Sequence, residues 1–181
     1  QALGNLFVVS AVESFNDEVL RRLHKGHTAA DAVAVIRAFQ RRGLTLRPSL
    51  VPFTPWETRE SLAQLFELAA REDLVDKIDP VHFSIRLLVP SGSLLLRDPD
   101  TAALFGDFDA ARFTHRWTHP DPEMDRIQRL LASISDDAQR AQEPVEQTFR
   151  RMAEVAAPGL DLLHPTTRRG QPPRLTEDWF C

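Results

Sequence analysis

The chain has little cysteine, no excess of basic residues and no long apolar run. Its 181 residues include a single cysteine, which excludes an intrachain disulfide framework. The 22 Lys and Arg residues are outnumbered by 26 Asp and Glu, and the formal net charge of −4 argues against a general nucleic-acid binder. No apolar stretch approaches the roughly 18 residues of a membrane span, and no glycine-rich phosphate loop or Ser-His-Asp order stands out. These absences predict a cytoplasmic protein that binds neither membranes nor nucleic acid.

Three apolar segments alternate with helical patterns along the first half of the chain. Leu6–Val12 is continuous, apolar and β-branched, as expected of a buried strand, and Leu44–Phe53 and Val81–Val89 are similar. Thr28 and Thr58 are suited to begin the helices that follow the first two strands. Strands that alternate with helices predict right-handed βαβ units and a parallel sheet.

A three-stranded parallel sheet of this kind is incomplete. Both of its edges would be unpaired, and such edges are normally covered or closed into a barrel. We therefore expect an α/β fold in which residues 1–96 form a partial (β/α) barrel, namely its C-terminal three βα units. A C-terminal helical extension is expected over residues 97–157, with helices near Pro122–Ser133 and Asp137–Ala157, and an extended proline-rich tail over residues 158–181.

Two arginines are expected to face the interior of this partial barrel. Because side chains alternate along a strand, Arg47 shares a face with Ser49, and Arg86 shares one with His82. The opposite, apolar faces suit the covering helices. An arginine buried there needs an anionic partner. Glu13 or a ligand carboxylate would serve, and an internal Arg–Glu salt bridge without any ligand fits the pattern equally well.

Several motifs give the first half of the chain a more specific character. Ser10–Leu20, which reads Ser-Ala-Val-Glu-Ser-Phe-Asn-Asp-Glu-Val-Leu, and the following Lys25–Thr28, Lys-Gly-His-Thr, resemble the fourth strand and helix of radical S-adenosylmethionine (SAM) barrels. Pro52–Thr58 stands where those enzymes have a Gly-x-Pro-x-Glu-Thr loop, but it lacks the glycine. Phe83–Leu95 and the ending Trp179–Cys181 resemble the radical SAM group with a Cys-Cys-Ala-Glu-Pro or Cys-selenocysteine-Ala-Glu-Pro tail.

This resemblance, which covers about residues 6–96, implies a cofactor and roles for named residues. Radical SAM enzymes hold a [4Fe-4S] cluster on a Cys-x3-Cys-x2-Cys loop and use it to convert SAM into a 5′-deoxyadenosyl radical. One cysteine cannot supply three thiolates, so this chain alone is expected to be inactive. By resemblance, Ser10 and Glu13 would contact the ribose or amino group of SAM, Arg47 would bind its carboxylate, and Arg86 would face the substrate.

The ends of the chain carry two further expectations. The chain begins with Gln1, which is consistent with a processing boundary or with a position inside a longer protein. If the tail resembles that of the selenocysteine group, a UGA codon follows Cys181, and an ordinary C-terminus is the alternative. A Cys-x3-Cys-x2-Cys motif upstream of Gln1 is expected if the enzyme interpretation holds.

The predicted function is therefore part of the SAM and substrate pocket of a radical SAM enzyme that modifies a peptide or other organic substrate. Two alternatives stay open. One is a non-catalytic half-barrel that serves binding or assembly, and the other is an unrelated α/β barrel fragment that binds an anionic metabolite through Arg47 and Arg86. His115, His119 and nearby acids resemble a metal-ligand cluster, but Pro120 and Pro122 break the required spacing. A surface loop that leads into a helix is the favoured interpretation of that segment.

Overall fold

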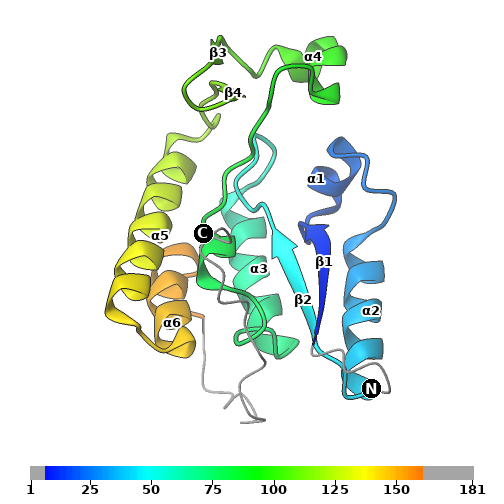
Figure 1. The fold of residues 1–181 in the computed structure, drawn as a ribbon, viewed down its shortest axis with the longest axis vertical. Helices are drawn as coiled ribbons and strands as arrows, with labels where there is room; N and C mark the ends of the chain where they lie inside the picture. The colour runs from blue at the N-terminus through cyan, green and yellow to red at the C-terminus, as the bar shows by residue number, and fades with distance from the viewer. Residues whose placement is uncertain (1–6, 161–181) are drawn as a thin grey trace.

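The computed structural model describes residues 7–160 (Figure 1). Residues 161–181, which include Cys181 and most of the predicted proline-rich tail, lie outside the described residues. The elements in chain order are β1 (Val8–Glu13), α1 (Asp17–Arg22), α2 (Ala29–Arg41), β2 (Leu46–Leu50), α3 (Arg59–Arg71), the 3-10 helices η1 (Pro80–Phe83) and η2 (Leu94–Arg97), α4 (Pro99–Ala102), β3 (Phe108–Asp109), β4 (Thr114–His115), α5 (Pro122–Ala141) and α6 (Val145–Ala156).

The first two strands pair in parallel, as the alternation of strands and helices predicts. Val9 is registered with Arg47 and Ser10 with Pro48, so that residues of a pair share one face of the sheet. The helix between the strands begins at Thr28, whose side chain and that of Asp31 form a reciprocal capping box. Helices α2 and α3 flank the two strands (Figure 1). Buried side chains of β1, β2, α2 and α3 belong to one hydrophobic core.

The prediction of a third strand over Val81–Val89 is largely wrong. The first part of this segment is the 3-10 helix η1, because Pro80 has a fixed φ and no N–H and so suits the first turn of a helix. What survives of the strand is a single parallel bridge between Phe53 and Arg86. Around this bridge, the Phe53 N–H donates to the Ile85 carbonyl at 3.1 Å, and the Leu87 N–H donates to the Phe53 carbonyl at 2.8 Å.

The described residues thus form a mixed α/β fold with two small sheets, of two strands each. Neither sheet closes on itself, and the partial barrel stays a prediction. The second sheet, β3–β4, belongs to a projecting segment with η2 and α4 that lies beyond the carboxyl ends of β1 and β2 (Figure 1). The sequence pattern gave no indication of this segment, because strands of two residues have no periodicity to read.

The helical extension shares a core with the first half of the chain. Three phenylalanines from α3, η1 and α6 form an aromatic cluster, in which the ring centroids of Phe66 and Phe83 lie 4.9 Å apart and both rings lie within 5.4 Å of Phe149. α5 is continuous from Pro122 to Ala141, so the expected boundary between Ser133 and Asp137 is wrong; the two helices are separated further along, where Pro144 precedes α6. Among the described residues, no helix combines the length and apolar character needed to cross a bilayer.

Candidate functional site

A small polar pocket lies beside β2, on the face of the sheet that carries Arg47. The Arg47 side chain is 7% exposed, and its Nη2 lies 2.6 Å from Oδ2 of Asp79. Its guanidinium also lies 5.4 Å from the centre of the Phe7 ring. The pocket has a volume of about 40 Å³ and is lined by Val9, Arg47, Pro48, Ser49, Lys77, Asp79 and His82. Strand alternation therefore correctly placed Arg47 and Ser49 on one face, away from buried Leu46 and Leu50.

A second cation of the pocket, Lys77, was not singled out by the sequence. Its side chain is 14% exposed, and its Nζ lies 2.8 Å from Oδ1 of Asp76 and 3.1 Å from Oδ2 of Asp73. Both cations of the pocket thus have a carboxylate close by, as partly buried charges require. Asp79 and Lys77 give no periodic signal, since they lie in the irregular connection between α3 and η1.

His82 completes the polar lining. The Leu50 N–H donates to its Nδ1 at 3.4 Å. Burial lowers the pKa of His82 below its ordinary value of 6.5. The ring is therefore neutral near pH 7, and the hydrogen bond at Nδ1 assigns its proton to Nε2.

Ser10 and Glu13, the two predicted SAM contacts on β1, lie in different places relative to Arg47. Ser10 is registered with Pro48, on the face of the sheet opposite to Arg47, and the structure does not bring the two together. Glu13 lies at a bulge in the register, with a φ of +68°, a strained backbone conformation for a residue with a side chain. Its Oε1 lies 3.4 Å from the Nζ of Lys25. Glu13 thus has a lysine partner, and the carboxylate that pairs with Arg47 belongs to Asp79.

Arg86 occupies a different environment from Arg47. Its guanidinium lies over the Trp117 ring at 3.5 Å from the centroid and donates to the Trp117 carbonyl at 2.7 Å. Its Nη1 donates to Oδ1 of Asp125 on α5. Burial opposes ionisation of Asp125, but hydrogen bonds from Arg86 and from the His119 N–H hold the pKa of this carboxyl below its usual range. Arg86 therefore joins the chain segment after η1 to α5, and it does not line the Arg47 pocket.

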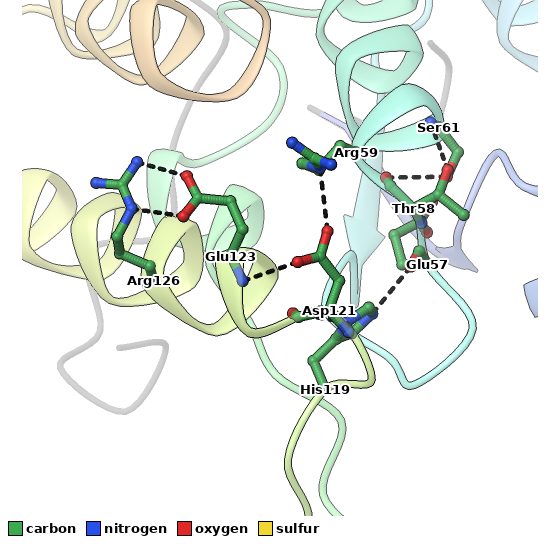
Figure 2. A network of polar contacts seen from close by, with 8 residues as sticks. All are labelled: Glu57, Thr58, Arg59, Ser61, His119, Asp121, Glu123 and Arg126. Atoms are coloured by element: carbon green, nitrogen blue, oxygen red, sulfur yellow. Dashed lines mark hydrogen bonds and ion pairs between the residues drawn. The ribbon is translucent and has the colours of Figure 1, made fainter.

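His119 anchors the start of α5 to the loop before α3 (Figure 2). Its Nε2 donates to the Glu57 carbonyl at 2.9 Å, and its Nδ1 accepts from the Asp121 N–H at 2.9 Å. The Asp121 carboxylate in turn accepts from the Glu123 N–H and lies 3.0 Å from Nε of Arg59. The interpretation of His119 as a surface-loop residue is wrong, because only 8% of this residue is exposed.

Glu57, in the Pro-Trp-Glu-Thr loop, is a buried carboxyl that the sequence did not single out. It accepts hydrogen bonds from the Ser61 hydroxyl and from Nδ2 of Asn16 (3.2 Å), and so ties the start of α3 to the start of α1. Burial raises the pKa of Glu57 above its ordinary value. Glu57 is only 4% exposed, and its hydrogen bonds with Asn16 and Ser61 make it a structural link between the loop before α3 and the start of α1.

The residues of this chain do not fit an iron–sulfur cluster. The single cysteine, Cys181, lies outside the described residues, and one thiolate is too few to ligate such a cluster. Between residues 7 and 160, no group of three or more His, Cys, Asp or Glu side chains is arranged to hold a metal ion. The pocket residues, by contrast, are chemically suited to the carboxylate of SAM, which a guanidinium and hydroxyl donors can bind.

No protein-family model, no curated protein sequence and no solved structure matches this chain. The comparisons therefore assign neither a family nor an activity. The resemblance to radical SAM barrels depends on the sequence motifs alone, those within residues 6–96 and the ending Trp179–Cys181.

Proposed function

We propose that this chain supplies part of the SAM and substrate pocket of a radical SAM enzyme that acts on a peptide or other organic substrate. The observation that supports this proposal best is the placement of Arg47. It is a buried arginine on one face of a parallel strand pair, and it lines a small pocket together with Ser49. That is the residue to which the sequence resemblance gives the carboxylate of SAM.

The chemistry of the pocket agrees with such a ligand. A guanidinium and a carboxylate form two parallel charge-assisted hydrogen bonds, which fix the orientation of the ligand as well as its affinity. Glu13, at the carboxyl end of β1, is an acid of the right sign to attract the SAM amino group, and its positive φ is a strain that often accompanies functional residues. Ser10 does not share the face of Arg47. The bulge after Ala11 takes Glu13 out of this alternation, and its charge reaches His82 of the pocket, so we assign the proposed SAM contacts to Glu13 and Arg47.

The proposed role of this chain is limited to binding and orientation. Bound SAM would supply the reactive deoxyadenosyl group, while the ligands for a cluster are not among the residues of this chain. Arg47 would hold the carboxylate end of SAM, and Arg86 would act indirectly by keeping α5 in place beside the strands.

Equilibrium dialysis of the 181-residue chain against radiolabelled SAM tests this proposal. We expect weak but saturable binding, and a loss of affinity of about tenfold or more in Arg47→Gln, which corresponds to about 1.4 kcal/mol. Arg126→Gln is the matched control, because Arg126 is an exposed arginine that pairs with Glu123 along the surface of α5. An absence of saturable binding at millimolar SAM, or equal binding by Arg47→Gln and the unmodified chain, would overturn the proposal.

A second candidate is a site for an anionic metabolite without an adenosyl group. It is favoured by the presence of two cations, Arg47 and Lys77, in the lining of one pocket. The same dialysis separates the two candidates when L-methionine is used as a competitor. Competition by L-methionine at the same concentration as unlabelled SAM would favour the metabolite site, because the adenosyl group would then add nothing to binding.

A further inference from the structure

Two uncharged hydrogen-bond donors face the Arg47 pocket without a partner. Ser49 and His82 both line it. Within residues 7–160, the Ser49 hydroxyl makes no hydrogen bond, and the only hydrogen bond of the His82 ring is the one that its Nδ1 accepts from Leu50. Neither donor is among the fully buried polar atoms, so solvent or a polar group of a ligand can reach both from the pocket.

The proton on His82 is directed to the pocket by its surroundings. Since the Leu50 N–H occupies Nδ1, the neutral ring carries its hydrogen on Nε2 and acts there as a donor. The charged groups whose fields reach this ring are Asp79, Arg47 and Glu13. Asp79 and Glu13 each have a cationic partner, Arg47 and Lys25. The pocket thus offers a neutral N–H donor, a hydroxyl and a nearby guanidinium.

The size and charge of the pocket decide the class of the ligand group. A volume of about 40 Å³ exceeds the ~15 Å³ that one water requires, and it suits one small end group of a ligand rather than a whole metabolite. Both cations have carboxylates beside them, so a ligand group with one negative charge is easier to accommodate there than a phosphate dianion with two. A planar, singly charged carboxylate matches two neutral donors and one arginine. The remainder of the ligand would extend along β1, where Val9 is 51% exposed.

We propose that Ser49 and His82 are binding residues that donate hydrogen bonds to a ligand carboxylate held beside Arg47. The Ser49 hydroxyl binds one edge of the group, and the His82 Nε2–H binds it from the side of η1. The identity of the ligand as SAM rests on the proposed function above, whereas the preference for a carboxylate rests on the pocket itself.

Isothermal titration with SAM and with decarboxylated SAM tests this assignment, since the two ligands differ only by the carboxylate. Ser49→Ala and His82→Ala are each expected to weaken SAM binding by about tenfold, within the range of a hydrogen bond to a charged group. Neither substitution should change the weaker binding of decarboxylated SAM. Ser49→Thr and His82→Gln, which keep a donor, are expected to retain more than half of the lost affinity. Circular dichroism checks that each variant is folded.

The possible outcomes separate the two proposals. Unchanged SAM binding in folded Ser49→Ala and His82→Ala, with a loss in Arg47→Gln, would overturn the assignment of these donors and leave the proposed function standing. Binding of L-methionine that depends on Ser49 and His82, with no binding of SAM, would overturn the proposed function and support the carboxylate site. Equal losses for SAM and decarboxylated SAM, or stronger competition by inorganic phosphate than by L-methionine, would overturn the carboxylate assignment.

Discussion

Arg47 and Arg86 are the most informative pair of residues in this molecule. They have similar sequence patterns, but they lie in different environments in the structure. Arg47 lines a pocket, and its partner Asp79 has a side chain that is 41% exposed. Arg86 is covered by the Trp117 ring, and its partner Asp125 is 16% exposed. A partly buried arginine can therefore belong to a binding site or to a structural contact between two parts of the fold. The surroundings of its carboxylate partner help to distinguish the two. We call the contacts of Arg86 with Trp117 and Asp125 the joint.

The pocket and the joint differ because of the segment that follows α3. Had Val81–Val89 been a regular strand, Arg86 and His82 would have shared a face with the Arg47 side of the sheet. The 3-10 helix that begins at Pro80 interrupts that alternation. His82 still lies in the Arg47 pocket, whereas Arg86 is directed to α5.

The largest expected effect comes from breaking the joint. Arg86→Ala should lower the free energy of unfolding by about 3 kcal/mol, because it leaves the largely buried Asp125 carboxylate without its guanidinium. It also removes the cation–π contact with Trp117. Urea denaturation followed by circular dichroism measures this change. A loss below about 1 kcal/mol would be typical of a surface ion pair and would contradict the structural role.

The second link between α5 and the rest of the molecule should have a smaller effect. His119→Ala removes the hydrogen bonds to the Glu57 carbonyl and from the Asp121 N–H, and it leaves a cavity, so we expect a loss of about 2 kcal/mol. His115→Ala is the matched control, because the hydrogen bond of the His115 ring with the Gly106 carbonyl is exposed. Equal losses in the two variants would show that His119 does not anchor α5.

Removal of the pocket arginine should change stability less than removal of Arg86. Arg47→Ala leaves Asp79, whose side chain is 41% exposed and can be solvated, so a loss of about 1 kcal/mol is expected. The same urea titration measures it. If Arg47→Ala destabilises the protein as much as Arg86→Ala does, the distinction between pocket and joint fails.

The smallest effect concerns pH. Burial holds the pKa of His82 below 6.5, so the unfolded chain takes up a proton that the folded chain excludes. Stability should therefore fall as pH decreases from about 6.5 through the folded pKa, and His82→Gln should make this fall shallower. Glu57, whose raised pKa acts in the opposite direction, is present in both proteins and cancels in the difference. Identical pH profiles from pH 5 to 7.5 would contradict the burial of a neutral His82.

Much of the first half of the fold could be predicted from local patterns. The β-branched run of β1 and the capping residues Thr28 and Thr58 predict elements that the structure confirms, because strand alternation and helix caps are properties of neighbouring residues. Alternation likewise places Arg47 and Ser49 on one face. The predicted SAM contacts themselves stay a prediction.

The remainder depends on contacts between distant residues. The hydrogen bond from His119 to Glu57 joins residues 62 positions apart, and the pair Arg47–Asp79 spans 32 positions. Neither leaves a periodic trace in the sequence. The burial of His119, the composition of the pocket and the contacts of Arg86 with Trp117 and Asp125 were therefore missed.

The most direct test of the account is a two-dimensional NMR titration of the ¹⁵N-labelled chain with SAM. If the carboxylate of SAM binds at Arg47, the amide signals of Val9, Ser49 and His82 should shift with increasing ligand, and decarboxylated SAM should shift them much less. The indole signal of Trp117, which donates to the Leu87 carbonyl beside the Arg86 joint, should stay in place. Shifts confined to Trp117 and its neighbours, or no shifts at saturating SAM, would contradict the account.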